Sequence, residues 1–215
     1  MLIKDYISYD NIYKPIVNNK VDPTILVINS GIEFPDAPTW TDRVNRLTSN
    51  PAYAELVIEV AEKLANEGHN VLVLSDRIQF LEICHELIEQ ETLLMVGSSK
   101  FGNDIIADRQ KAHKDVGKGT RIILGTTSIY KEGIDIPQLS ALVLAVPTKN
   151  KFMLEQIVGR ITRPSPGKKS PIVVDIGLDG FTARKQLEER LNFYVLENNY
   201  KVINTDKLSR VKTQS

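Results

Sequence analysis

The sequence has few of the residues from which cross-links and metal sites are built. Cys84 is the single cysteine among 215 residues, which excludes an internal disulfide and a cysteine zinc site. We expect Cys84 to be a buried, unreactive thiol on the apolar side of a helix. His69, His85 and His113 are scattered without the spacing of metal ligands, and we interpret them as surface or helix residues.

The sequence also lacks an excess of charge of one sign and any long hydrophobic run. Its 27 basic and 27 acidic residues give a net charge of zero, which argues against a polybasic nucleic-acid tail but not against local basic patches. A hydrophobic content of 42% is typical of a globular protein with a buried core. We see no signal peptide and no run near the length of a membrane span, so we expect no membrane partner and a cytoplasmic location.

Short apolar runs alternate with amphipathic segments along most of the chain. The expected strands are 24–29, 71–75, 92–97, 121–127, 141–147 and 171–176, and the expected helices are 50–68, 78–90, 104–114, 154–163 and 181–196. This alternation predicts an α/β fold with a mostly parallel sheet and helices on both faces. We expect an N-terminal extension or linker (1–23), one domain (24–202) and a flexible tail (203–215), with a loop at 31–40.

Polar residues follow four of the expected strands, in segments 75–77, 97–100, 126–128 and 147–149. In open parallel sheets, ligands bind beyond the carboxyl ends of the strands. Backbone amides, hydroxyls and cations gathered at that edge suit phosphate groups. Each segment taken alone is also typical of a simple helix cap.

The segment Leu154–Lys168, LEQIVGRITRPSPGK, joins an apolar helix face to two arginines. Gln156, Arg160 and Arg163 are spaced three or four residues apart, so one helix face can direct all three into a cleft. Gly159 permits close approach to the backbone, and the two prolines that follow end the helix. Because guanidinium groups match phosphate oxygens, we interpret the segment as an arginine-finger helix; the alternative is an amphipathic helix with solvated arginines.

Two of these segments resemble the second RecA-like domain of superfamily 2 helicases and translocases. The stretch 123–145 resembles helicase motif V, with Thr127, Gly133 and Asp135 at its signature positions. The stretch 155–168 resembles motif VI and matches Q-x-x-G-R-x-x-R without a gap. The resemblance implies a RecA-like fold.

The resemblance extends to weaker motifs and covers roughly residues 24 to 180. Residues 71–80 resemble motif IV, and residues 97–110 resemble the segment that follows it. The glutamine that opens motif VI resembles the DNA-repair, recombination and phage branch-migration branch, whereas DEAD-box RNA helicases usually have histidine there. The resemblance therefore implies DNA, rather than RNA, as the nucleic-acid partner, and the host cytoplasm as the location if a phage encodes the chain.

The resemblance also implies roles for the motif VI residues. In the family, this helix reaches ATP bound to the first RecA-like domain. Arg160 and Arg163 would then contact the γ-phosphate, and Gln156 would orient them or contact the nucleotide. The cofactor-binding set implied by the resemblance is completed by Gly133, Asp135 and Gly159.

The nucleic-acid track is implied at the carboxyl edge of the sheet. Contacts to backbone phosphates carry no sequence information, which suits a motor that steps along any sequence. Helix capping is the alternative role of Ser75 and Thr127, and turn formation that of Asp135. The implied nucleic-acid-binding residues are Ser75, Arg77, Gly97, Ser98, Thr126 and Thr127.

A G-x-x-x-x-G-K-[ST] phosphate loop and an acidic Mg²⁺-binding box are both missing from the sequence. We therefore expect ATP and Mg²⁺ to be bound mostly by an absent N-terminal RecA-like domain of the same protein. The chain is then the C-terminal motor domain of an ATP-dependent DNA helicase, inactive by itself. The alternatives are a stand-alone nucleic-acid-binding or regulatory module that never meets ATP, and an unrelated doubly wound enzyme, for which we find no dinucleotide loop or nucleophile elbow.

Overall fold

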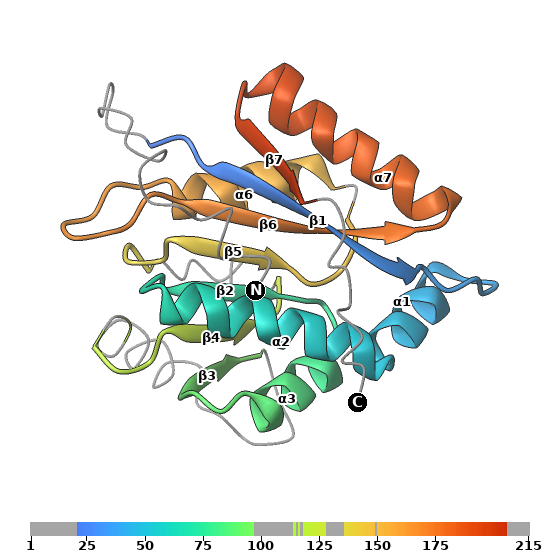
Figure 1. Cartoon of the computed structure of the whole chain (residues 1–215), viewed down its shortest axis with the longest axis horizontal. Coiled ribbons are helices and arrows are strands. Elements are labelled where there is room, and N and C mark those ends of the chain that lie inside the picture. Colours follow the sequence, from blue (N-terminus) through green and yellow to red (C-terminus); the bar gives the residue numbers. More distant parts are fainter. Residues whose placement is uncertain are drawn as a thin grey trace, which may run out of the picture.

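A computed structural model describes residues 21–96, 114, 116, 118–127, 136–148 and 150–205. Within these residues, seven strands form one sheet in the order β3-β4-β2-β5-β6-β1-β7 (Figure 1). Each pair of neighbours runs parallel, so the predicted α/β fold with a parallel sheet is confirmed. The strands are β1 (Thr24–Glu33), β2 (Val71–Leu74), β3 (Thr92–Met95), β4 (Ile122–Gly125), β5 (Ala141–Leu144), β6 (Ile172–Asp179) and β7 (Lys201–Thr205).

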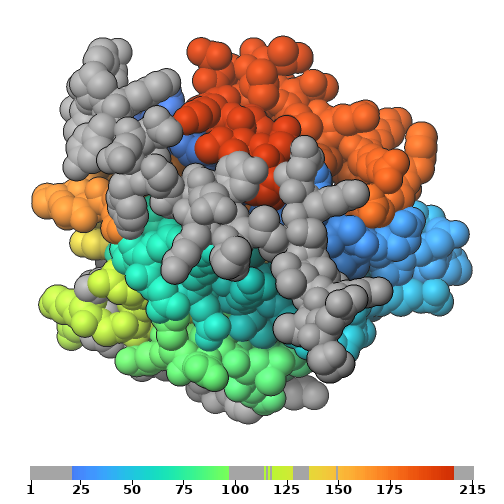
Figure 2. Space-filling model, in the orientation of Figure 1, coloured from blue at the N-terminus to red at the C-terminus, as the bar shows by residue number. Residues whose placement is uncertain are grey.

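Helices cover both faces of this sheet. In Figure 1, α2 (Pro51–Asn66) and α3 (Ile78–Leu87) lie in front of the sheet and α6 (Lys151–Ile161) lies behind it. The teal and green side chains of α2 and α3 adjoin one another on the front face in Figure 2. The other described helices are α1 (Trp40–Thr48), α7 (Phe181–Asn192) and the π-helical turn η2 (Phe193–Glu197).

The two faces form separate hydrophobic cores because successive strand residues point to opposite sides of a sheet. On β2, Val73 belongs to the core shared with α2 and α3, whereas its neighbour Leu72 belongs to the core shared with α6. Cys84 on α3 is fully buried in the first core, and burial raises the pKa of its thiol to about 12. The prediction of a buried cysteine is therefore confirmed.

Asparagine side chains cap the starts of α2 and α6. The Asn50 side chain accepts a hydrogen bond from the amide of Ala52, and Pro51 occupies the first turn of α2. Asn150 caps α6 in the same way, with its side-chain oxygen accepting from the amide of Met153. The Asn150 cap marks where the chain, after leaving β5, turns back along the sheet as α6.

The expected loop at 31–40 is wrong at both of its ends. Strand β1 continues through Glu33, and its pairing with β6 changes register between Asn29 and Glu33. Gly31, with φ of 67°, lies in this irregular part of the strand and allows the local bend. Helix α1, which begins at Trp40, was not predicted because its nine residues bury only three side chains and give a short apolar period.

The predicted flexible tail is also wrong over its first three residues. Residues 203–205 belong to β7, which pairs in parallel with β1 at the edge of the sheet. None of its residues is fully buried, so β7 lacks the apolar run that marks the other strands. Residues 206–215 lie outside the described part, as do all residues of the expected 104–114 helix except Lys114.

A buried ion pair joins the last helix to the middle of the sheet. The Arg190 guanidinium on α7 donates from Nε and Nη2 to the two carboxylate oxygens of Asp175 on β6, at 2.7 and 2.8 Å. The Tyr194 hydroxyl donates to the same carboxylate at 3.0 Å. Arg190 also donates from Nη1 to the carbonyl of Thr148, at 2.9 Å. One guanidinium thus holds β6, α7 and the β5–α6 loop together.

The neighbouring Asp175 carboxylate keeps the Arg190 guanidinium ionised. Burial by itself would lower the pKa of Arg190, but the adjacent Asp175 carboxylate outweighs burial and raises it. Burial, and then the same carboxylate, raise the pKa of Tyr194 well above its ordinary value, so its hydroxyl remains a donor. Asp175 and Arg190 are 1% and 3% exposed, so a change to either partner leaves the other charged in a dry site.

We expect Asp175→Ala to lower the free energy of unfolding by about 3 to 5 kcal/mol, because it leaves the Arg190 charge buried without its partner. The measurement is urea denaturation followed by far-UV circular dichroism. Asp179→Ala is the matched control, since it removes a surface ion pair with Arg184 that should contribute about 0 to 1 kcal/mol. Equal losses for the two variants would contradict this account.

Candidate functional site

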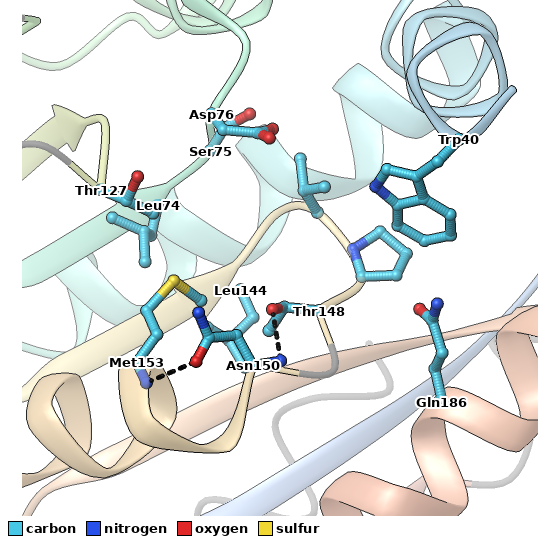
Figure 3. A pocket seen from close by; sticks show the side chains of 12 residues that line it. Trp40, Leu74, Ser75, Asp76, Thr127, Leu144, Thr148, Asn150, Met153 and Gln186 are labelled. Atoms are coloured by element: carbon cyan, nitrogen blue, oxygen red, sulfur yellow. Dashed lines mark hydrogen bonds between the residues drawn. The ribbon is translucent and has the colours of Figure 1, made fainter.

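A pocket of about 420 Å³ opens at the carboxyl edge of the sheet. Leu74 and Leu144, the last residues of β2 and β5, form part of its floor, and Met153 on α6 adds a flexible apolar side chain (Figure 3). Trp40 from α1 and Gln186 from α7 lie on the same side of the pocket. The pocket therefore gathers the ends of two central strands, the starts of α1 and α6, and the middle of α7.

Two of the predicted nucleic-acid-binding residues, Ser75 and Thr127, line this pocket. Ser75 is 1% exposed, and its hydroxyl accepts a hydrogen bond from the amide of Arg77 at 3.1 Å. This contact forms a tight turn before α3; it is not the helix cap that sequence reasoning left open as the alternative, because the α3 N-cap is Arg77 and no side chain caps that helix. Thr127 is half-buried, while its neighbour Thr126 is buried beside the end of β3, where its amide donates to Met95.

Arg77 is anchored at the surface beside this edge. Its Nε donates to the Asn45 side chain on α1 at 2.8 Å, and its Nη1 lies 2.9 Å from the Asp76 carboxylate. Asp76 also lines the pocket. The guanidinium is therefore held in place by two neighbours, one of which offsets its charge.

Four predicted site residues lie outside the described part of the chain: Gly97, Ser98, Gly133 and Asp135. Their proposed roles in binding nucleic acid or nucleotide therefore remain predictions from the resemblance.

The motif VI residues lie on the side of α6 that faces away from the core. Leu154, Ile157, Val158 and Ile161 are buried against the sheet. Gln156 is exposed, Arg160 is half-buried, and a Cβ atom at Gly159 would meet nothing within 4 Å. The outer side of the helix around Gly159 thus has room for a ligand close to the backbone.

The sequence pattern predicted that Arg163 lies on the helix, and this prediction is wrong. Helix α6 ends at Ile161 with Thr162 as its C-cap, and the Arg163 amide continues the turn with a weak 3.4 Å hydrogen bond to the Arg160 carbonyl. The two arginines remain close because this last turn tightens beyond the regular helix. Arg163 is exposed, and its own carbonyl accepts a hydrogen bond from the Lys168 ammonium at 2.6 Å.

The predicted site residues lie in two regions, one at each end of helix α6. Its first turn borders the pocket at the carboxyl edge, through Asn150 and Met153. Its last turn lies at the amino edge, where the Thr162 carbonyl accepts from the amide of Val21, just before β1. The arginines and the predicted phosphate-binding edge are therefore joined by one helix of 11 residues, about 16 Å long.

The turn after motif VI is fixed to the C-terminal end of α2. The Lys169 ammonium donates to the Glu67 carbonyl, which is the α2 C-cap. A cation at a helix C-terminus is stabilised by the helix dipole and by the last carbonyl groups. This contact ties the chain that follows the two arginines to the amino edge of the sheet.

His69 lies at the same edge, and its interpretation as a surface residue is wrong. It is 3% exposed, and its Nδ1 lies 3.1 Å from the Ser140 hydroxyl, which also accepts from the amide of Asn70. Burial, and then the nearby Lys169 charge, lower the pKa of His69 to about 4. The ring is therefore neutral at pH 7, and its Nδ1 can accept a hydrogen bond from the Ser140 hydroxyl.

Sequence reasoning missed Trp40 and Gln186 as pocket residues. The sequence pattern predicts a loop rather than a helix at Trp40, and it assigns no site residue to the helix expected at 181–196. A capping signal was present: the Thr39 hydroxyl accepts from the amide of Asp42 and caps α1. No comparable signal marks Gln186, because its position depends on how α7 packs beyond the end of β6.

The described residues contain neither a cluster of metal ligands nor a helix able to span a membrane. They contain no group of three or more His, Cys, Asp or Glu side chains placed to hold a metal ion. None of their helices combines the length and apolar character that a bilayer crossing requires.

Comparison with known proteins gives this fold a family. The family model described as "Helicase conserved C-terminal domain" matches residues 53–165. Because this match covers more than half of the chain, the chain belongs to that family. It is a C-terminal RecA-like domain of the superfamily 2 helicase class, as the motif order predicted.

Three proteins with sequences similar to this chain come from viruses. The chain is 33% identical over 209 residues to "Probable helicase D10" of Escherichia phage T5, covering 94% of the chain and 45% of the relative. It is 25% identical over 187 residues to "ATP-dependent DNA helicase uvsW" of Enterobacteria phage T4, covering 81% and 37%. It is 29% identical over 139 residues to "Putative ATP-dependent RNA helicase L396" of Acanthamoeba polyphaga mimivirus, covering 64% and 25%.

A solved structure supports the same fold. The crystal structure of T4 UvsW superposes with a TM-score of 0.63 at 18% sequence identity, covering 86% of this chain and 42% of UvsW. At that identity the likeness shows the RecA-like fold alone. The chain spans less than half the length of these curated relatives.

The buried His69 predicts how stability depends on pH. The unfolded chain binds a proton near the ordinary pKa of 6.5, while the folded chain does so only near 4. Between these values the unfolded state binds more protons, so stability falls as the pH falls. We expect roughly 2 kcal/mol to be lost from this residue between pH 7.5 and pH 5.

The check is urea denaturation at the two pH values for wild type, His69→Gln and the matched control His85→Gln. His69→Gln should show a smaller pH dependence than wild type, and the exposed His85 should not change it. An unchanged pH dependence in His69→Gln would show that another group accounts for it.

Proposed function

We propose that this chain is the C-terminal motor domain of an ATP-dependent DNA helicase or translocase. The observation that carries the proposal is helix α6, which buries its apolar side and presents Gln156, Gly159 and Arg160 on the other, with Arg163 one turn further on. This arrangement fits a surface that meets a nucleotide held by another domain. If the chain were a stand-alone binding module, two arginines at this position would have no evident role.

The residues on this surface fit a triphosphate. Arg160 and Arg163 offer planar groups of donors that match phosphate oxygens, and Gly159 leaves space for a phosphate near the backbone. The two arginines neutralise the charge that develops on the transferred phosphoryl group, and Gln156 orients them or contacts the nucleotide. Gly133 and Asp135 complete the nucleotide contacts, with Asp135 beside the ribose or motif VI.

Most of the ATP and the Mg²⁺ ion would be held by an N-terminal RecA-like domain of the same protein. When bound, Mg²⁺ offsets the charge of the β- and γ-phosphates. Closure of the cleft between the two domains would bring α6 to the nucleotide, and opening would release the products. This chain alone is then inactive as an ATPase.

The carboxyl edge of the sheet would carry part of the nucleic-acid track. Ser75 and Thr127 line the pocket, and Arg77 supplies a cation held by Asn45 and by the pocket residue Asp76. The other track residues are Gly97, Ser98 and Thr126. DNA is the proposed substrate because Gln156 opens motif VI and because one relative bears the name of a DNA helicase.

Helix α6 would couple the two places. Its last turn carries Arg160 and leads directly into Arg163, and its first turn borders the pocket. A helix packed along one side moves as a rigid body, so a shift of the arginines toward ATP displaces the pocket edge as well. The Arg190–Thr148 hydrogen bond holds the loop that starts this helix.

We expect Arg163→Ala and Arg160→Ala, each made in the complete protein, to lower DNA-stimulated ATP hydrolysis by about 10³-fold or more while DNA binding persists. Arg184→Ala is the matched control, since Arg184 is an exposed arginine on α7. The readouts are phosphate release and fluorescence anisotropy of a labelled DNA strand. Wild-type hydrolysis by Arg163→Ala would reject the arginine-finger assignment.

We expect Thr127→Ala to weaken DNA binding by severalfold and ATP binding much less, because the threonine lies at the proposed track. Thr92→Ala is the control, as Thr92 is equally half-buried but lies at the amino end of β3. Anisotropy with labelled DNA and with a labelled ATP analogue measures both affinities. The opposite pattern would make Thr127 a purely structural residue.

A further inference from the structure

The carboxyl-edge pocket contains a buried acceptor without a partner. Gln186 on α7 is 9% exposed, and its side-chain oxygen, Oε1, has no hydrogen-bond partner among the described residues. An unsatisfied buried polar atom is costly, and natural proteins retain few of them. Figure 3 shows the amide end of Gln186 directed to the pocket below Trp40. The pocket is therefore suited to a ligand that carries an N–H or O–H donor.

The same pocket offers a flat aromatic surface. Trp40 is the single tryptophan of the chain and is 38% exposed, although its ring also packs on Phe34 with centroids 5.2 Å apart. The indole thus has one side held by the core and another available at the pocket. The contact with Phe34 accounts for the buried part of the Trp40 side chain.

The remaining walls favour a flat ligand with a polar edge. The apolar side chains of Leu144, Val146, Pro147 and Met153 line the pocket. The volume of about 420 Å³ falls within the range of small-ligand pockets. A planar ring with N–H groups on its edge satisfies both the aromatic wall and the Gln186 acceptor.

We propose that this pocket binds one unstacked base of the tracked nucleic-acid strand, with the base stacked on Trp40 and donating a hydrogen bond to Gln186 Oε1. This inference rests on the proposed function, because the pocket lies beside the residues assigned to the phosphate backbone. Aromatic stacking tolerates any base, so the pocket grips the strand without reading its sequence. The Gln186 acceptor adds a preference for bases with an edge N–H group.

The first experiment uses the fluorescence of the chain's single tryptophan. The 215-residue chain is titrated with a single-stranded DNA 12-mer and with a 12-mer of the same length made of abasic sugars. We expect the base-containing strand to quench Trp40 and the abasic strand to leave it unchanged. Equal responses to the two strands, or no response to either, would overturn the proposal.

Variants test the two contacts separately. Trp40→Ala should weaken binding of the base-containing strand by about 5- to 100-fold and leave abasic binding unchanged, while Trp40→Phe should retain part of the affinity. The control is Phe181→Ala, an exposed aromatic residue that does not line the pocket. For Gln186, the probe is a strand of adenine compared with one of unsubstituted purine, which has no edge N–H. Wild type should prefer adenine, and Gln186→Leu should lose that preference.

This test separates the inference from the proposed function. If DNA binds and stimulates ATP hydrolysis in the complete protein but Trp40→Ala binds both strands like wild type, the base pocket is wrong and the motor assignment stands. If the complete protein hydrolyses no ATP while the 215-residue chain shows base-dependent quenching, the motor assignment fails and the pocket stands.

Discussion

The buried contact between Asp175 and Arg190 organises the functional edge of this domain. Asp175 lies on β6, inside the sheet, and Arg190 reaches it from α7, which follows six of the seven strands in the sequence. The same guanidinium holds the carbonyl of Thr148, where the chain turns into α6. A hydrophobic contact could close the core as well, but it would not fix the direction in which this loop leaves the sheet.

Because this loop is fixed, α6 holds the carboxyl-edge pocket and the two arginines in a defined position relative to each other. Asn150 caps α6 beside the pocket, and the opposite end of the helix delivers Arg160 and Arg163 to the amino edge. Lys169 then anchors the following turn to α2. The helix is therefore held at both ends by polar contacts and along its length by apolar packing, as a part that transmits small movements must be.

Local sequence signals predicted most of the sheet because its central strands are continuous apolar runs. They also predicted α2 and α6, whose caps and buried stripes are strong. They did not predict β7 or α1, which bury little side-chain surface and depend on neighbours distant in sequence. The motif VI pattern found the arginines, yet Trp40 and Gln186 came together only through packing of α1 and α7 on the sheet edge. The burial of His69 likewise depends on Ser140, 71 residues away.

The central claim is that this domain completes an ATPase whose other half lies on a separate RecA-like domain. The most direct measurement is ATP hydrolysis, with and without DNA, by the 215-residue chain alone and by the same chain joined to an N-terminal helicase domain. We expect the single domain to be inactive and the joined protein to hydrolyse ATP faster when DNA is present. Hydrolysis by the 215-residue chain alone would contradict the claim, because its arginines would then have a nucleotide site within this fold.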